Sequence, residues 1–154
     1  MSNEFHHVSV LLEECLNGLN IRPDGIYLDG TLGRAGHSSR IAQRLTTGTL
    51  ICVDRDQAAL DAAQNRLAEW MDRVTLVHSN FSELGDVLVE AGVAGVDGML
   101  FDLGVSSPQL DEAERGFSYN SDARLDMRMD REAPLSAYEV VNGYSESELA
   151  RIIF

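Results

Sequence analysis

The chain has 154 residues, of which 44% are hydrophobic, so it is long enough for one domain with a buried core. Its formal net charge of −13 argues against sequence-independent binding of nucleic acid, because such binding depends on neutralising phosphates with Lys and Arg. No apolar stretch approaches the roughly 18 residues that a membrane span needs, and the first residues lack the pattern of a signal peptide. We therefore expect a cytoplasmic protein without a membrane partner.

Cysteine and histidine predict neither a disulfide framework nor a metal site. Cys15 falls in a helical pattern and Cys52 in an apolar run, as is typical of buried free thiols. The four histidines lack the spacing of zinc ligands. We therefore predict that no metal is bound.

Short apolar runs alternate with amphipathic stretches through the first hundred residues. Because parallel strands need crossovers, and right-handed crossovers place helices on both faces, this alternation predicts a doubly wound parallel α/β sheet of the Rossmann-like type. A helix after the first strand is capped by Ser38 or Ser39 and broken by Gly48. The other predicted helices cover about 11–19, 57–71 and 81–91, and the strands cover 26–28, 50–53, 74–77 and 99–101.

The pattern changes after Gly104 to a polar, turn-rich stretch through about Asp130, a length typical of functional or disordered loops. Pro134 and Ser136 then start a short helix, and the Ser145-x-x-Glu148 capping box opens another. We divide the chain into a Rossmann-like domain at 1–114, and a substrate-side loop with the start of a helical insertion at 115–154. The uncapped apolar end at 153–154 and the open sheet edge predict a truncated chain.

Ligands of such sheets bind at the carboxyl ends of the strands, near the point where strand order reverses. Gly30, Gly33 and Gly36 follow the first strand, where glycines let the backbone approach a ligand, although such a loop alone can equally be a turn. Asp54 ends the second strand, and a carboxylate there can accept hydrogen bonds from both hydroxyls of an adenosine ribose. The alternative is that Asp54 is a helix N-cap.

The glycine spacing favours S-adenosylmethionine over a dinucleotide. In G-x-G-x-x-G the second glycine makes room for a pyrophosphate, whereas here the spacing is Gly30-x-x-Gly33-x-x-Gly36. Asp29 suits the methionine ammonium, because a carboxylate there would repel a phosphate. After the third strand, Phe81 can offer an aromatic face to the adenine, or it can be part of the core.

The segments after the fourth strand contain motifs with neither helical nor strand periodicity. In a doubly wound order, the fourth strand lies beside the first strand. With earlier motifs, these motifs resemble in order those of the ribosomal RNA small-subunit methyltransferases H, or MraW family, which methylate the exocyclic N4 of a cytosine at the ribosomal decoding centre. The resemblance covers the whole chain. It rests on His7-x-x-Val10-Leu11-Leu12, Asp29-Gly30-Thr31, Gly36-His37-Ser38, Asp54-Arg55-Asp56, Asp102-Leu103-Gly104-Val105-Ser106-Ser107 with Gln109-Leu110-Asp111, Arg115-Gly116-Phe117-Ser118 and Leu125-Asp126-Met127-Arg128-Met129.

The resemblance implies a class I S-adenosylmethionine-dependent methyltransferase that acts on small-subunit ribosomal RNA or on the small ribosomal subunit. It implies that Ala35, Gly36 and His37 line the methionine end, Asp54 holds the ribose, Phe81 flanks the adenine, and Asp102 and Gln109 complete the cofactor site. Asp29 and Gly33 join this set from the loop.

Two departures from the family are visible. Ala35 stands where the family usually has glycine, and its methyl group is tolerable only at negative φ, so cofactor affinity could be reduced. Family members also continue well past Phe154, through a helical insertion and back into the last strands of the sheet.

Methyl transfer is an in-line displacement, so the protein mainly positions and desolvates the nucleophile. Because the lone pair of cytosine N4 is conjugated with the ring, acceptors for the amino hydrogens would help the reaction. The candidates for this catalytic role are the Asp102 carboxylate and the 104–107 turn, which includes Ser106 and Ser107. The base is expected to be unpaired or extruded.

Four arginines are the candidate contacts with RNA phosphates: Arg115, Arg124, Arg128 and Arg131. The alternative is intramolecular pairing with Asp122, Asp126 and Asp130. Two other functions also stay open. A nicotinamide-dependent oxidoreductase shares the fold and the ribose carboxylate, and a noncatalytic fragment would bind cofactor only. We expect the 154 residues alone to be poorly active, and the sequence leaves a homodimer open.

Overall fold

The computed structural model describes residues 9–154, which form two compact units. The first unit ends at Leu103 and the second begins at Gly104. The compact division therefore comes earlier than the boundary that we placed after residue 114. None of the helices in the described part of the chain has the length and apolar character to cross a membrane.

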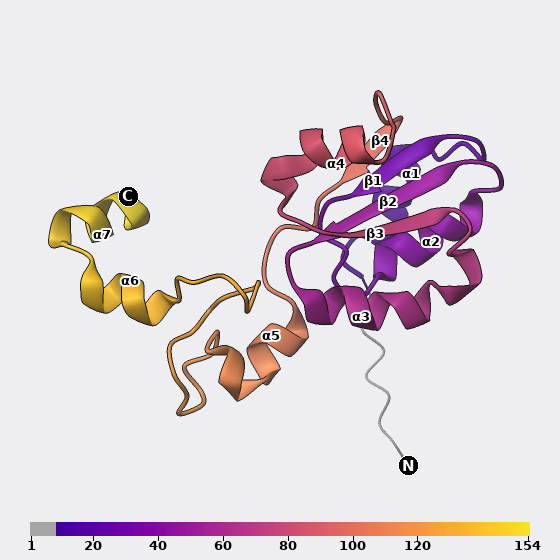
Figure 1. The fold of residues 1–154 in the computed structure, drawn as a ribbon. Coiled ribbons are helices and arrows are strands. Elements are labelled where there is room, and N and C mark those ends of the chain that lie inside the picture. The colour runs from indigo at the N-terminus through magenta and orange to yellow at the C-terminus, as the bar shows by residue number, and fades with distance from the viewer. Residues whose placement is uncertain (1–8) are drawn as a thin grey trace, which may run out of the picture. The chain divides into compact units, whose positions relative to one another are not determined.

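A four-stranded parallel sheet forms the centre of the first unit (Figure 1). The strands are β1 (Ile26–Asp29), β2 (Thr49–Asp54), β3 (Val74–His78) and β4 (Gly98–Leu100), in the order β3-β2-β1-β4. Leu28 of β1 is in register with Ile51 of β2 on one side and Met99 of β4 on the other. The chain thus builds the sheet outward from β1 to β3 and then crosses to the other side of β1. This order confirms the doubly wound prediction and places the reversal between β1 and β4.

Helices cover both faces of this sheet, as predicted. The larger core packs α1 (Leu12–Leu19), α2 (Gly36–Arg44) and α3 (Gln57–Arg66) against one face, and α4 (Leu84–Glu90) packs against the other. Side chains of β2 alternate between the two cores, because successive residues of a strand point to opposite faces. Leu50 and Cys52 enter the larger core, whereas Ile51 and Val53 enter the smaller one.

The helix α2 begins at Gly36, so the prediction that Ser38 or Ser39 caps it is wrong. Both serines lie in the first turn, where their hydroxyls have other partners. Ser38 donates to the Asp29 carboxylate, and Ser39 donates to the carbonyl of Gly36. Ala35 occupies the N-cap position and supplies no side-chain cap.

Two predicted helices are each divided into an α-helix and a short 3₁₀ turn. The stretch predicted at 57–71 is α3 followed by η1 (Ala68–Trp70), and the stretch predicted at 81–91 is η2 (Phe81–Glu83) followed by α4. The Asn80 side chain accepts a hydrogen bond from the Ser82 amide at the start of η2. The predicted strand at 99–101 ends at Leu100, which leaves Phe101 outside the sheet.

The second unit contains α5 (Ser107–Asp111), η3 (Ala113–Arg115), α6 (Ala137–Gly143) and α7 (Glu146–Ile153). The stretch 104–130 was predicted to be a loop, but it contains α5, which begins with a capping box formed by Ser106 and Gln109 around Pro108. The predicted starts of the last two helices are confirmed. Ser136 and Ser145 each form a capping box with a glutamate three residues later.

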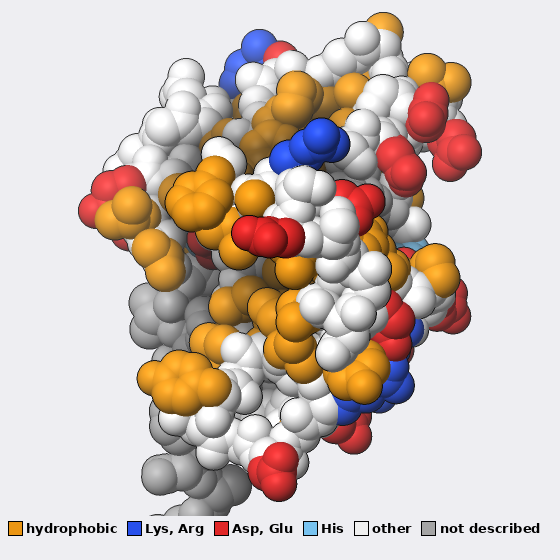
Figure 2. Space-filling model, turned by 90° about the vertical axis from the view of Figure 1, so that its left-hand side faces the viewer, with side chains coloured by type: hydrophobic (Ala, Val, Ile, Leu, Met, Phe, Trp, Pro, Cys, Tyr) orange, Lys and Arg blue, Asp and Glu red, His pale blue; other side chains and the backbone are white. Residues whose placement is uncertain are grey.

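Large hydrophobic side chains are exposed in both units, and exposed hydrophobic side chains are drawn in orange in Figure 2. In the second unit, the exposed residues include Tyr138 and Val141 of α6 and Ile152 and Ile153 of α7. Neither helix has a buried residue, so their apolar side chains do not contribute to a core within the second unit. The two cysteines are free, with Cys52 buried and Cys15 half-buried.

Candidate functional site

The loop between β1 and α2, residues 30–35, lies across the carboxyl ends of three strands. The Gly30 amide donates to the Leu100 carbonyl at the end of β4 over 3.0 Å. The Leu32 amide donates to the Val53 carbonyl of β2 over 3.1 Å. This loop therefore spans the point where strand order reverses, which is the position that the glycine pattern predicted for a ligand.

Asp29 is buried beneath this loop, with 1% of its surface exposed. One carboxylate oxygen accepts the Thr31 amide over 3.1 Å, and the other accepts the Ser38 hydroxyl over 2.6 Å. Burial raises the pKa of the Asp29 carboxyl, and the hydrogen bond from Ser38 opposes that shift. The Asp29 side chain is thus surrounded by the loop and the start of α2.

Asp54 joins the end of β2 to the same loop. Its Oδ2 accepts the Gly33 amide over 2.8 Å, and its Oδ1 accepts the Asp56 amide over 2.9 Å. The N-cap of α3 is Asp56, whose carboxylate accepts the Ala58 amide over 3.1 Å. The alternative that Asp54 caps the helix is therefore wrong. Asp54 remains half-buried and is anchored to the loop that we predicted to bind a ligand.

Two residues of the loop have a positive φ: for Gly33 this explains the choice of glycine, whereas for Ala35 it is unfavourable. Gly33 has a φ of +50°, in the left-handed region that glycine occupies at little cost. Ala35 has a φ of +57° and is fully buried, so the negative φ that its methyl group was expected to require is absent. For a residue with a Cβ, this conformation costs about 1–2 kcal/mol.

The first described residues lie against the start of α2. A Cβ added to Gly36 would collide with the Ser9 hydroxyl, so the Ser9 side chain would have to move to admit any other residue there. The His37 ring is buried and its Nε2–H donates to the Val10 carbonyl over 3.0 Å. His7, in the first motif of the resemblance, lies outside the described residues.

Thr31 connects the loop after β1 with the segment after β4. Its hydroxyl oxygen accepts the Asp102 amide over 2.7 Å, while its own amide donates to Asp29. Asp102 is exposed just beyond β4. Because Asp54 holds Gly33, all three aspartates predicted for the site are joined by hydrogen bonds through one short loop.

Two aromatic side chains lie together near the carboxyl ends of the strands. The Phe81 and Phe101 rings pack edge to face, with centroids 5.9 Å apart and planes at 78°. Their exposed fractions are 44% and 42%, so Phe81 is not a core residue. The Phe101 ring also covers Gly30, where an added Cβ would collide with it. Sequence reasoning missed Phe101 because it assigned this residue to a buried strand.

The remaining cofactor and catalytic candidates belong to the second unit. Gln109 is buried, and its amide oxygen accepts the Ser106 amide over 3.0 Å at the start of α5. Ser106 is the half-buried N-cap of this helix, and Ser107, its first residue, is exposed. In this unit Gln109 therefore has a clear structural role, which leaves its predicted cofactor contact as a prediction.

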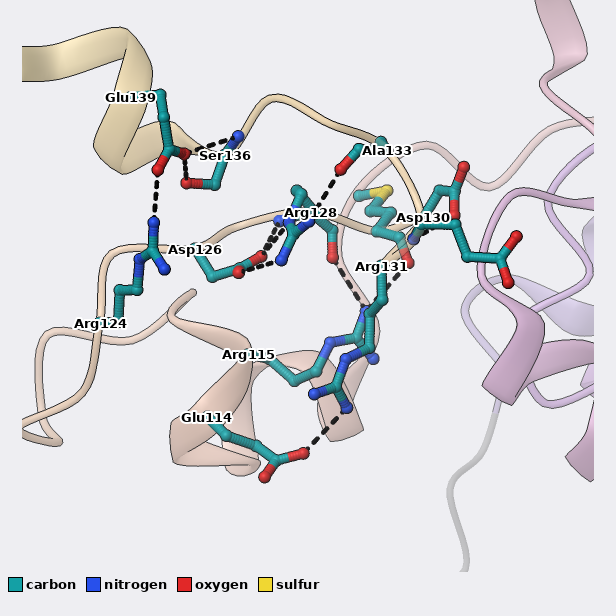
Figure 3. A network of polar contacts seen from close by, with 12 residues as sticks. Glu114, Arg115, Arg124, Asp126, Arg128, Asp130, Arg131, Ala133, Ser136 and Glu139 are labelled. Atoms are coloured by element: carbon teal, nitrogen blue, oxygen red, sulfur yellow. Dashed lines mark hydrogen bonds and ion pairs between the residues drawn. The ribbon is translucent and has the colours of Figure 1, made fainter. Parts of the chain in front are cut away.

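The four arginines predicted to contact RNA all make intramolecular contacts (Figure 3). Arg128 binds both oxygens of Asp126, with distances of 2.9 Å from Nε and 2.7 Å from Nη2. These hydrogen bonds lower the pKa of the Asp126 carboxyl to about 2. We named Asp122, Asp126 and Asp130 as possible intramolecular partners of the arginines, and this ion pair confirms Asp126.

The other arginines in Figure 3 have partners that the sequence analysis did not name. Arg124 pairs with Glu139 of α6, and Arg131 pairs with Glu114 over 2.9 Å. Arg115 is buried, and its guanidinium donates to the carbonyls of residues 128 and 129 over 3.1 Å each. Arg115 therefore holds the 127–129 segment in place rather than presenting a charge to solvent. Within residues 9–154, no group of three or more acidic, histidine or cysteine side chains is placed to hold a metal ion.

The order β3-β2-β1-β4, the loop after β1 and the acidic residue ending β2 define a Rossmann-like, doubly wound fold with a nucleoside-type site. A putative rRNA-methylase from Clostridium thermocellum has this fold with a TM-score of 0.55 at 17% identity, covering 64% of this chain and 53% of that chain. Precorrin 8W decarboxylase from Methanobacterium thermoautotrophicum gives a TM-score of 0.50 at 16% identity, covering 59% and 46%. The chain belongs to the MraW methylase family, whose model matches residues 4–154.

Curated relatives agree with this family. The ribosomal RNA small subunit methyltransferase H of Brevibacillus brevis is 64% identical over 151 residues, which are 97% of this chain and 48% of that protein. The protein of the same name from Paenibacillus sp. is 60% identical over 156 residues, covering 97% and 49%. The chain thus spans about half the length of the curated relatives that it matches.

Proposed function

We propose that this chain binds S-adenosylmethionine, and that the protein containing it methylates the exocyclic N4 of a cytosine in small-subunit ribosomal RNA at the decoding centre. Membership of the MraW methylase family supports methyl transfer over the nicotinamide-dependent alternative. The relatives named ribosomal RNA small subunit methyltransferase H support the RNA substrate. The observation that carries the cofactor proposal is the Asp54 carboxylate, half-buried at the end of β2 and bonded to Gly33 in the loop that spans the reversal of strand order.

The geometry of Asp54 fits a ribose. A carboxylate can accept about four hydrogen bonds, two at each oxygen. Backbone amides of Gly33 and Asp56 each occupy one position on a different oxygen. Each oxygen therefore keeps acceptor capacity, which suits the two neighbouring hydroxyls of a ribose.

Both ends of the cofactor also find suitable groups in the first unit. The exposed Phe81 ring offers an apolar face to the adenine, with Phe101 against it. The first turn of α2 presents backbone amides that have no acceptor within the helix, and such amides favour a carboxylate like that of the methionine moiety. We assign this end of the site to Ala35, Gly36 and His37.

When bound, the cofactor supplies a methyl group activated by a positively charged sulfur. The residues of this chain then have to orient the cytosine amine and exclude water from it. The Asp102 carboxylate is our candidate acceptor for an amino hydrogen, because the Thr31 hydroxyl fixes the Asp102 backbone beside the cofactor loop. Ser106, Ser107 and Gln109 lie in the second unit, and their contacts with the amine or the cofactor stay predictions from the sequence. RNA contact by Arg124 and Arg128 would require phosphates to share these arginines with Glu139 and Asp126.

The test is methylation of unmodified small subunits by the full-length protein with S-adenosylmethionine labelled in its methyl group. We expect the label in N4-methylcytidine after digestion of the RNA and mass spectrometry of the nucleosides. The Asp54→Ala variant is the matched control and should transfer much less label. A label in another nucleoside would refute the proposed substrate, and a tightly held nicotinamide nucleotide would refute the proposed cofactor. The 154 residues alone, in the same assay, test our expectation that they are poorly active.

A further inference from the structure

We propose that Asp29 is a positioning residue that clamps the two ends of the cofactor loop, and that it does not bind the methionine ammonium directly. The inference rests on the proposed function, since it concerns the same cofactor. It replaces the direct electrostatic role that the sequence suggested for this residue.

The contacts of Asp29 bracket the loop. Thr31 is near the start of the loop and donates its amide to one Asp29 oxygen, over 3.1 Å. Ser38 is in the first turn of α2, beyond the end of the loop, and donates its hydroxyl to the other oxygen over 2.6 Å. A single carboxylate thus fixes the distance between the two segments that flank Gly33 and Ala35.

Burial separates Asp29 from any ligand. Its side chain is 1% exposed, and Ser38 has no exposed surface. A cation reaching this carboxylate would have to displace the loop, and the cofactor site requires that loop in place. Asp54 and Asp102, in contrast, are half-buried and exposed, respectively, so they remain accessible. Burial also raises the pKa of the Asp29 carboxyl, as expected for a group whose partners are a hydroxyl and an amide rather than a cation.

The clamp acts on the whole loop rather than on one end of the cofactor. Thr31 carries the hydroxyl that holds Asp102, and Gly33 carries the amide that holds Asp54. If the clamp is released, the adenosine side and the methionine side should therefore both lose their geometry. A direct contact with the ammonium would instead affect the methionine side alone.

This difference can be measured with two ligands. S-adenosylhomocysteine carries the ammonium and carboxylate, whereas 5′-methylthioadenosine keeps the adenosine and the sulfur and lacks both charged groups. Affinities of the full-length protein for the two are measured by calorimetry or competition. Ser38→Ala is the decisive variant, because it breaks the clamp and leaves the Asp29 charge in place. We expect Ser38→Ala to lower the affinity for both ligands by a similar factor, about tenfold.

Three further variants complete the test. Asp29→Asn should weaken both ligands by a similar factor, and the double variant with Ser38→Ala should lose less than the product of the two single effects, because both changes break one contact. Ser39→Ala is the matched control: it removes a neighbouring hydroxyl that bonds to Gly36 within the same turn, and both affinities should stay within about twofold. Thermal unfolding of each variant shows that the protein is folded at the assay temperature.

The outcomes separate the two ideas. If Asp29→Asn weakens only S-adenosylhomocysteine, and Ser38→Ala changes neither affinity, Asp29 binds the ammonium and the clamp is wrong. If Ser39→Ala weakens both ligands as much as Ser38→Ala does, the effect belongs to helix packing and the clamp is also wrong. A wild-type protein that binds neither ligand would overturn the proposed function itself.

Discussion

Replacement of Asp54 by alanine tests the ribose assignment most directly. The change removes the acceptor for two ribose hydroxyls, and hydrogen bonds to a charged group contribute about 1.5–3 kcal/mol. It also releases the Gly33 amide, which Asp54 holds at 2.8 Å, so the loop loses an anchor as well as a ligand contact. We expect the affinity for S-adenosylhomocysteine to fall about ten- to a hundredfold.

Asp56→Ala is the matched control, since the two aspartates are two residues apart and have different roles. Asp56 caps α3, and loss of such a cap costs about 1 kcal/mol of stability without removing a ligand contact. Calorimetric titration of the full-length variants should therefore show weak binding for Asp54→Ala and nearly wild-type binding for Asp56→Ala. Chemical denaturation should show that Asp56→Ala is destabilised. Equal affinities for wild type and Asp54→Ala would refute the ribose assignment.

The remaining predictions concern backbone strain and pH. Ala35→Gly should change the unfolding free energy by less than about 1 kcal/mol, because relief of the left-handed conformation is offset by the added entropy of the unfolded chain and by loss of a fully buried methyl group; a change of several kcal/mol in urea denaturation would contradict this. Burial raises the pKa of Asp29 above its ordinary value of 3.8, so the folded protein holds this proton to a higher pH than the unfolded chain does. The unfolding free energy of the wild type should therefore decline relative to that of Asp29→Asn as pH rises from about 4 through the folded-state pKa. A difference in unfolding free energy that stays constant with pH would count against a buried carboxylate. For Asp126 the pH dependence of stability has the opposite direction, because the pKa of its carboxyl is lowered to about 2. Its pair with Arg128 should stabilise the protein above pH 4, and this contribution should disappear as pH falls towards 2. Denaturation of Asp126→Asn across this range, with no loss of stability at any pH, would refute that pairing.

Local patterns were sufficient to predict the sheet and the faces of its helices. The β2 run of Leu50, Ile51, Cys52 and Val53 is apolar at every position, which is what a strand covered on both faces requires. The carboxyl ends of β1 and β2 then place Asp29 and Asp54 near the loop, whatever their detailed contacts.

What could not be predicted depends on contacts between distant residues. The start of α2 differs from expectation because the Ser38 hydroxyl binds Asp29, nine residues earlier, and is unavailable as a cap. Arg124 pairs with Glu139, fifteen residues later, so a pattern of nearby opposite charges suggested the wrong partner. The positive φ of Ala35 is likewise set by the loop and cannot be read from the residue type. In contrast, α5 had a readable signal in Ser106, Pro108 and Gln109.

The bond from the Asp102 amide to the Thr31 hydroxyl has a consequence for the energetics of recognition. It lies where strand order reverses, so it ties the loop after β1 to the segment after β4. Because this bond is already formed in the protein alone, the ligand proposed above need not spend its interaction energy on bringing these two segments together. One hydroxyl thus preorganises both segments for the proposed ligand.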